Sequence, residues 1–280
     1  MTFYRTKDGT RIFYKDWGQG LPIVFLHGWP LSGDAWDAQM LYFGANGHRV
    51  IAHDRRGHGR SEQTWHGNDI NRYADDLSEL IETLDLKNIV LVGHSTGGGE
   101  AVRFIGRHGS TRLSRLVLVG AVPPLMLRTN DNPDGAPIEI FDTIRQSVAT
   151  NRSQYFRDIC DAFYGFNRID ADKSQGLCDS FWSQGMMGGI KAQHDCIHAF
   201  SAVDYSEDLA KVDIPTLFIH GDDDQMVPID ISARKAAELI PHALLKVYRG
   251  GGHGLAQTHV AEFNTDLTTF IGSATNMPSK

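Results

Sequence analysis

The chain has 280 residues, of which 41% are hydrophobic and 22% charged, and its formal net charge is −7. This composition excludes a disordered, collagen-like or coiled-coil chain, and net acidity with no basic cluster beyond Arg55-Arg56 argues against a nucleic-acid partner. Apolar runs such as Ile23–Leu26 are too short to span a membrane, and Met1–Gly9 lacks the apolar core of a signal peptide. We therefore expect a soluble protein that stays in the cytoplasm.

The first elements predicted are two strands. Thr2–Thr6 and Arg11–Trp17 alternate apolar and polar residues around the turn-like Asp8-Gly9, which predicts an N-terminal hairpin. Beyond it, short apolar runs typical of strands buried on both faces alternate with segments of helical period. The runs are Ile23–Leu26, Val50–Ala52, Ile89–Val92, Leu116–Val119, Thr216–Ile219 and Leu244–Val247. The helical segments are Gly33–Phe43, Ile70–Leu84, Gly97–Arg107, Ile231–Ile240 and His259–Ile271. This alternation predicts an α/β protein with a mostly parallel central sheet and helices on both faces.

One long stretch interrupts the alternation of strands and helices. Between about Pro123 and Val212 we find no buried strand, only segments of helical period that are rich in aromatic residues and methionine. We interpret residues 123–212 as a helical cap inserted over the C-terminal edge of the sheet. The core domain would then consist of residues 1–122 and 213–280.

The cysteines and the glycine-rich stretches exclude several classes of site. Cys160, Cys178 and Cys196 form no C-x-x-C pair, so we expect free and mostly buried thiols. No metal-ligand spacing and no glycine-rich nucleotide motif is present. The sequence therefore predicts neither a metal site nor a cofactor.

A G-x-S-x-G motif, Gly93-His94-Ser95-Thr96-Gly97, follows the expected strand Ile89–Val92 and opens the next helix. A nucleophile elbow requires this strand–turn–helix context, because glycines remove the side chains that would crowd the tight turn. The turn presents the serine hydroxyl above the sheet, beside the free N–H groups at the start of the helix. Ser95 is therefore the candidate nucleophile.

A serine nucleophile needs a general base, and His253 is the candidate. It lies in the glycine-rich segment Gly250–Gly254, just past the last strand, where a loop can hold the imidazole over the elbow. His94 is next to Ser95 in the chain, so we expect its side chain to point elsewhere and to support the site or form pocket wall. Three further histidines are expected to be structural: His220, His242 and His259.

The acid that orients the base is expected in the chain order serine, aspartate, histidine. Three neighbouring aspartates follow the strand Thr216–Ile219: Asp222, Asp223 and Asp224. The pattern G-x-x-D-x-x-V-P, which ends at Pro228, favours Asp224. Asp222 remains the alternative, because period-2 alternation puts it on the same side as Asp224.

Acyl transfer also needs donors for the negative charge that develops on the carbonyl oxygen. The strand Ile23–Leu26 ends in His27-Gly28-Trp29-Pro30, and Thr96 directly follows the candidate nucleophile. The main-chain amides of Trp29 and Thr96 are the expected oxyanion hole. Pro30 has no N–H and stiffens this loop without supplying a donor.

Four segments of the chain together resemble one family, the cofactor-free (non-haem) haloperoxidases and aryl esterases of the α/β-hydrolase superfamily. They are His27–Pro30, Asp54–Ser61, Gly93–Glu100 and His220–Pro228. The resemblance runs nearly end to end and implies an α/β-hydrolase fold with a helical cap. It also implies a Ser95–Asp224–His253 triad without a cofactor, and an acyl pocket walled by Trp29, Met226 and Ile229. This chain departs from the family pattern at two places. His94 and Thr96 flank the serine where relatives often carry an aromatic residue and a methionine, and Arg249 puts a charge near the loop that carries His253. Both departures bear on the range of substrates.

The sequence therefore predicts a serine hydrolase that acts on short-chain or aryl carboxylic esters through an acyl-enzyme. The resemblance implies a side activity with hydrogen peroxide, as perhydrolase and haloperoxidase, and relatives often form closed homo-oligomers. A lactamase, amidase or carbon–carbon bond hydrolase uses the same triad and remains an alternative. A non-catalytic ligand-binding protein of the same fold is a further alternative.

Overall fold

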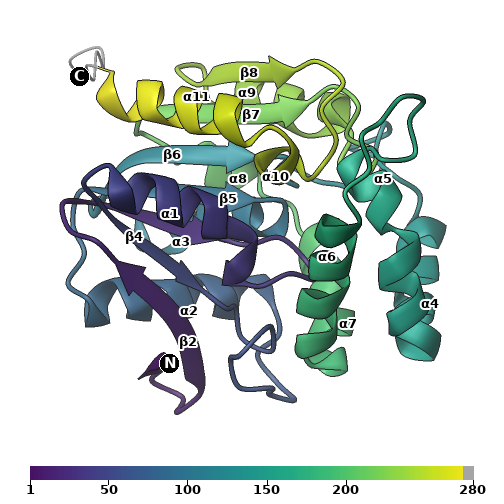
Figure 1. Ribbon diagram of the computed structural model, residues 1–280, viewed down its shortest axis with the longest axis horizontal. Coiled ribbons are helices and arrows are strands. Elements are labelled where there is room, and N and C mark those ends of the chain that lie inside the picture. Colours follow the sequence, from purple (N-terminus) through teal and green to yellow (C-terminus); the bar gives the residue numbers. More distant parts are fainter. Residues whose placement is uncertain (274–280) are drawn as a thin grey trace.

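The computed structural model describes residues 1–273, so the last seven residues of the predicted core segment 213–280 lie outside the described residues. Within these residues eight strands form one sheet in the order β1-β2-β4-β3-β5-β6-β7-β8 (Figure 1). The strands are β1 Thr2–Arg5, β2 Arg11–Trp17, β3 Leu21–Leu26, β4 His48–His53, β5 Ile89–His94, β6 Leu113–Val119, β7 Thr216–Gly221 and β8 Leu244–Tyr248. The pairs β1–β2 and β2–β4 are antiparallel and every other pair is parallel. The predicted hairpin and mostly parallel sheet are confirmed.

Helices of the core cover both faces of the sheet. They are α1 Asp37–Ala45, α2 Ile70–Thr83, α3 Thr96–His108, α9 Ala233–Leu239, α10 Leu255–Thr258 and α11 Val260–Gly272, with short 3-10 helices at Gly33–Trp36 and Ile229–Ile231. Alternate residues of β3 explain the two layers, because successive side chains of a strand point to opposite faces. Ile23 belongs to the buried cluster that contains Met40 of α1 and Phe263 of α11, whereas Val24 belongs to the cluster with Leu77 of α2.

Two predicted elements differ from the structure. The segment expected as one helix at Gly33–Phe43 is broken into a 3-10 turn and α1, and the hydroxyl of Ser32 accepts from the amide of Asp34 at the start of that turn. The run Leu244–Val247 forms a strand, but Leu244 is 60% exposed. Leu244 is exposed because β8 is an edge strand of the sheet and pairs only with β7.

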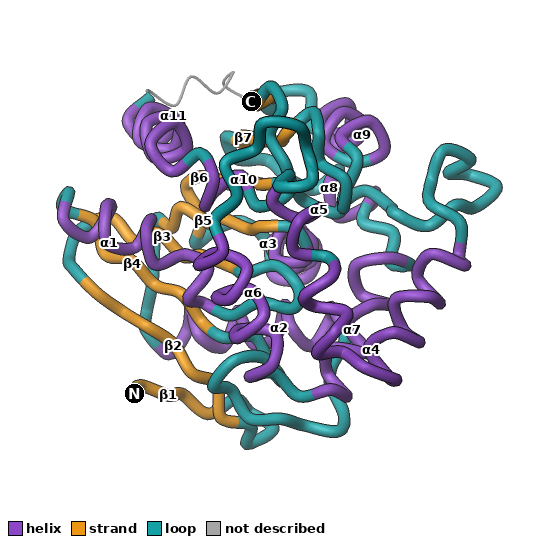
Figure 2. Tube along the Cα trace, turned by 45° about the vertical axis from the view of Figure 1, so that its right-hand side comes forward, coloured by secondary structure: helices purple, strands orange, loops and turns teal. Residues whose placement is uncertain are grey.

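The segment between β6 and β7 is helical and stands beyond the carboxyl ends of the parallel strands, at the right of Figure 1. Its helices are α4 Ile138–Asp158, α5 Cys160–Tyr164, α6 Gln175–Met187, α7 Ile190–Ser201 and α8 Ser206–Leu209. Helices α4 and α7 lie side by side (Figure 2). The short α8 packs instead on α3, where Arg103 pairs with Asp208 at 3.1 Å. The boundaries 123 and 212 of a separate cap stay a prediction.

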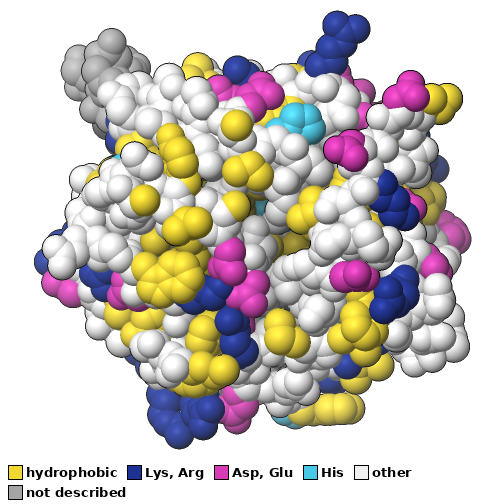
Figure 3. Space-filling view, viewed as in Figure 1, with side chains coloured by type: hydrophobic (Ala, Val, Ile, Leu, Met, Phe, Trp, Pro, Cys, Tyr) yellow, Lys and Arg dark blue, Asp and Glu magenta, His cyan; other side chains and the backbone are white. Residues whose placement is uncertain are grey.

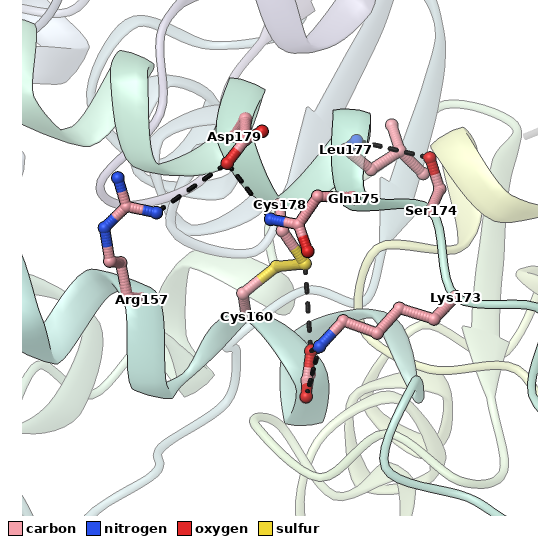
Figure 4. The surroundings of a disulfide bond; sticks show 9 residues. Arg157, Cys160, Lys173, Ser174, Gln175, Leu177, Cys178 and Asp179 are labelled. Carbon is pink, nitrogen blue, oxygen red and sulfur yellow. Dashed lines mark hydrogen bonds and ion pairs between the residues drawn. A yellow bond between two sulfur atoms is a disulfide. The ribbon is translucent and has the colours of Figure 1, made fainter.

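The prediction of free thiols is wrong for two of the three cysteines. Cys160 of α5 and Cys178 of α6 form a disulfide, with their Cα atoms 5.6 Å apart (Figure 4). Their separation of 18 residues gave no local sign of pairing, because only the return of α6 along α5 brings the two residues together. Cys196 is free and buried, as expected.

No helix in residues 1–273 combines the length and the apolar character needed to cross a membrane. On the face shown in Figure 3, Lys and Arg side chains lie interspersed with Asp and Glu rather than gathered in one basic patch.

Candidate active site

Ser95 occupies a sharp turn between β5 and α3. Its backbone has φ +55° and ψ −119°, a conformation that is costly for a residue with a side chain and that marks functional sites. The turn is held because the amide of Ser95 donates to the carbonyl of Val119 on β6 at 2.9 Å. A Cβ on Gly97 would lie 2.4 Å from the carbonyl oxygen of Leu26, so the close approach of α3 to β3 requires glycine there.

His253 and Asp224 are brought together by two loops at the carboxyl end of the sheet. Asp224 lies three residues after β7 and His253 lies in the loop between β8 and α10. The Nδ1 atom of His253 lies 2.7 Å from Oδ2 of Asp224, and both side chains are buried. This contact orients the imidazole, and His253 and Ser95 line the same cavity.

The carboxylate of Asp224 is held ionised by its surroundings. Its Oδ1 atom accepts hydrogen bonds from the amides of Met226 at 2.9 Å and Val227 at 2.8 Å. Burial by itself raises the pKa of Asp224, but attraction to His253 and hydrogen bonds from His220 and His253 outweigh burial. The pKa of Asp224 is therefore held well below its ordinary range.

The two neighbouring aspartates have other partners. Asp222, the alternative acid, accepts the amide of Gly250 at 2.6 Å and so fixes the start of the loop that carries His253. Asp223 pairs with Arg168 of the segment after α5 through two contacts of 2.6 Å. Of the three candidates, Asp224 is the one whose carboxylate contacts His253.

Two further histidines contact the residues of the site, and of these sequence reasoning expected a supporting role only for His94. His220, expected to be structural only, has its Nε2 atom 2.8 Å from the carbonyl of Val227 and 3.3 Å from Oδ2 of Asp224. His94 is buried behind the site with its Nε2 atom 3.0 Å from the carbonyl oxygen of His253. Burial, together with repulsion from His253, lowers the pKa of His94 to about 3. The only sequence signal for His220 was its position at the end of a strand that precedes the acid.

The amides of Trp29 and Thr96 flank the serine from two elements. Thr96 is the first residue of α3, so its N–H has no acceptor within the helix, and Trp29 lies in the turn after β3. Neither amide donates a hydrogen bond to another group in residues 1–273. A Cβ on Gly28 would lie 3.0 Å from the Cβ of Ser95, which shows how closely this turn approaches the serine.

Arg55, which forms a buried ion pair with Glu100, supports the turn after β3. Arg55 donates to Glu100 at 2.7 Å, and the main-chain amide of Arg55 donates to Nε2 of His27 at 2.9 Å. The indole nitrogen of Trp29 donates to the carbonyl of Gln193 on α7 at 2.9 Å. The turn is thus fixed to both the core and the helical segment.

Ser95 and His253 line a cavity of about 520 Å³ between the sheet and the helical segment. Its wall is mostly apolar and includes Val122, Phe141, Ile144, Ile159, Phe163 and Phe200. Of the three pocket residues that the resemblance implied, Trp29 and Met226 line this cavity. Ile229 does not; it belongs to the buried core, and Ile231 lines the wall instead.

Comparison with known proteins agrees with this geometry. The family model of the α/β-hydrolase fold matches residues 22–259. The chain belongs to the α/β-hydrolase family. It is 53% identical to a non-haem haloperoxidase from Rhodococcus erythropolis, over 98% of this chain and 100% of that protein. It is 50% identical to a bifunctional esterase/perhydrolase from Acinetobacter calcoaceticus, over 98% of this chain and 100% of that protein.

A solved structure places this α/β-hydrolase in the same group. The bromoperoxidase from Bacillus anthracis superposes with a TM-score of 0.91 at 39% identity, over 95% of this chain and 97% of that one. The expected resemblance to the non-haem haloperoxidases and the expected fold are thereby confirmed. This α/β-hydrolase is an enzyme of the hydrolase type.

Proposed function

We propose that this α/β-hydrolase is a serine esterase that cleaves small carboxylic esters through an acyl-enzyme on Ser95. The observation that carries the proposal is the 2.7 Å contact between Nδ1 of His253 and Asp224, at a cavity that Ser95 also lines. A base oriented by a buried acid beside a strained serine is the arrangement that activates a hydroxyl nucleophile.

In the first half of the proposed reaction, His253 takes the proton of Ser95 as the hydroxyl attacks the ester carbonyl. Asp224 stays ionised, holds the imidazole in one tautomer and stabilises the imidazolium. The amides of Trp29 and Thr96 donate to the oxyanion, and each such donor contributes about 2.7–4 kcal/mol to barrier lowering in other serine hydrolases. His253 then gives its proton to the leaving alcohol.

In the second half, His253 removes a proton from water as the water attacks the acyl-enzyme. The bond between Ser95 Oγ and the acyl carbon then breaks, His253 returns the proton to Ser95, and the acid is released. Hydrogen peroxide in place of water would release a peracid. The peracid oxidises bromide or chloride to hypohalous acid and becomes the carboxylic acid. Relatives named as haloperoxidases and as esterase/perhydrolase support this second activity.

The substrate we propose is a small ester with a short-chain or aryl acyl part. The volume of the cavity, about 520 Å³, and its aromatic and aliphatic wall suit such a molecule. A cytoplasmic location and a closed homo-oligomer stay predictions.

The test is hydrolysis of p-nitrophenyl acetate by the wild type and by Ser95→Ala, with bromination of a dye followed in acetate, hydrogen peroxide and bromide. We expect both activities in the wild type and neither in Ser95→Ala. Hydrolysis that persists in Ser95→Ala would refute the proposal. Absence of turnover in both proteins would favour the ligand-binding alternative.

A further inference from the structure

The outer end of the active-site cavity carries charge, in contrast to its apolar interior. Three charged side chains line it there: Arg128, Asp134 and Asp230. All three are exposed, whereas Ser95 and His253 at the inner end are buried. A substrate whose ester reaches Ser95 therefore extends past apolar wall toward these charges.

The two aspartates already have cationic partners. Asp134 pairs with Lys235 of α9 at 3.0 Å, and Asp230 pairs with Arg234 at 2.8 Å. Asp131, in the same loop as Asp134, does not line the cavity. The charge on the cavity wall that lacks a counter-ion within residues 1–273 is the guanidinium of Arg128.

Arg128 is held in place by two hydrogen bonds, one from its main chain and one from the Nε atom of its guanidinium group. Its main-chain amide donates to the carbonyl of Ala136 at 2.8 Å, and its Nε atom donates to the carbonyl of Gly135 at 3.0 Å. The two terminal nitrogens, Nη1 and Nη2, have no hydrogen-bond partner within residues 1–273. The orientation of the group is thus fixed while two nitrogens with their N–H donors remain available.

The loop that carries Arg128 is itself closed by hydrogen bonds. The side-chain amide of Asn132 donates to the carbonyls of Leu125 and Leu127, each at 2.9 Å. Lys235 of α9 donates to the side-chain oxygen of Asn132 at 3.1 Å, which ties the loop to the core. Little rotamer freedom therefore remains to be lost when Arg128 binds a ligand.

We propose that Arg128 selects esters that carry a carboxylate at the end opposite to the reacting ester, separated from it by an apolar chain or ring. Two free N–H bearing nitrogens in one plane match the two oxygens of a carboxylate. The apolar wall suits the linker, and the net charge of −7 means that a free carboxylate finds little attraction on the remaining surface. This inference rests on the proposed function, because it assigns the substrate class of the same site.

The test compares two series of methyl esters at neutral pH. One series is the half-esters of straight-chain dicarboxylic acids from succinate to sebacate; the other is the same molecules with a carboxamide in place of the distal carboxylate. The enzymes are the wild type, Arg128→Met, Arg128→Lys and the control Arg145→Met. Arg145 is a cation of α4 that pairs with Asp142 at 2.7 Å and lines a different cleft.

For the wild type we expect kcat/KM of the best half-ester to exceed that of its carboxamide by about tenfold. Arg128→Met should bring this ratio close to one through a much larger loss on the half-ester than on the carboxamide ester, whereas Arg128→Lys should retain part of the preference. Arg145→Met should behave as the wild type. High salt should reduce the preference in the wild type, since an exposed ion pair is screened.

A wild-type ratio near one at every chain length would overturn the inference, as would an equal loss on both series in Arg128→Met. In both cases hydrolysis of the carboxamide esters that depends on Ser95 would leave the proposed function standing. If the wild type hydrolyses neither series nor p-nitrophenyl acetate, the proposed function fails, and the inference fails with it.

Discussion

His220 lies fully buried beneath the acid of the candidate triad, where its Nε2 atom faces both Val227 and Asp224. The substitution His220→Met removes this donor, and we expect kcat on p-nitrophenyl acetate to fall about tenfold with little change in KM. His220→Gln, which keeps a donor at the same reach, should retain most of the activity. Equal kcat in His220→Met and the wild type would show that the contact has no part in positioning Asp224.

Gly28 lets the turn after β3 approach the serine. A Cβ there would lie 2.8 Å from Nδ1 of His94 and 3.0 Å from the Cβ of Ser95, so Gly28→Ala must displace the turn that carries the Trp29 amide. We expect kcat to fall about a hundredfold, the cost typical of one lost oxyanion donor. The control is Gly176→Ala on α6, where the nearest atom is 3.8 Å away. Steady-state kinetics of the two variants test this prediction. An equal loss of kcat in Gly28→Ala and Gly176→Ala would contradict it.

Sequence reasoning predicted the positions of those candidate site residues whose setting is local in the chain. Ser95 follows a strand and opens a helix, and Asp224 follows a strand within a distinctive pattern, so their surroundings are encoded nearby. The contacts of His220 and the placement of Ile231 rather than Ile229 on the wall depend on how two loops fold over each other. Such contacts between segments cannot be deduced from spacing along the chain.

Helices α5 and α6 are joined by the Cys160–Cys178 disulfide in the layer next to the active site. Phe163 of α5 contacts the ring of His253 with centroids 4.9 Å apart, and its carbonyl accepts the amide of Gly254 at 2.9 Å. A disulfide that closes a loop of 18 residues contributes about 3 kcal/mol by restricting the unfolded chain. We expect the double variant Cys160→Ser/Cys178→Ser to lose about this free energy of unfolding.

Urea unfolding measures that loss, and Cys196→Ser serves as the control for replacing a buried cysteine that forms no disulfide. A reducing agent should lower the stability of the wild type toward that of the double variant and leave the double variant unchanged. A wild type that is indifferent to reducing agent would contradict the assigned stabilisation.

The order of strands and helices was predictable because each buried strand is a short apolar run between turn signals. What the pattern did not reveal depends on neighbours. The apolar run of β8 predicts a buried strand, but β8 lies at an edge of the sheet. Ser32 caps a 3-10 turn, and this turn breaks the expected helix. Helical period predicts helices between β6 and β7 but not how α5 and α6 face each other, so the disulfide was missed.

At the scale of the whole molecule, several histidines are buried in neutral form. Burial and repulsion from Arg55 lower the pKa of His58 to about 3 and the pKa of His27 well below its ordinary value. Burial and repulsion from His253 lower the pKa of His94 to about 3. The unfolded chain takes up these protons near pH 6.5, whereas the folded chain does not. The contribution of these three histidines to the free energy of unfolding is therefore fully present above about pH 6.5. As the pH decreases below that value, the free energy of unfolding falls by up to about 4 kcal/mol per pH unit.

Urea unfolding at a series of pH values from neutral to acid measures this slope. His58→Gln should reduce the slope by about 1.4 kcal/mol per pH unit, while substitution of the exposed His66 should leave it unchanged. Stability that stays constant as the pH falls below 6.5 would be incompatible with burial of neutral histidines.

The central claim is that Ser95 carries the acyl group, and intact-protein mass spectrometry tests it most directly. The enzyme is mixed briefly with p-nitrophenyl acetate, quenched in acid and digested to locate the modification. We predict that the wild type gains the mass of one acetyl group on Ser95 and that Ser95→Ala gains none. Hydrolysis without this label, or the label on another residue, would contradict the claim.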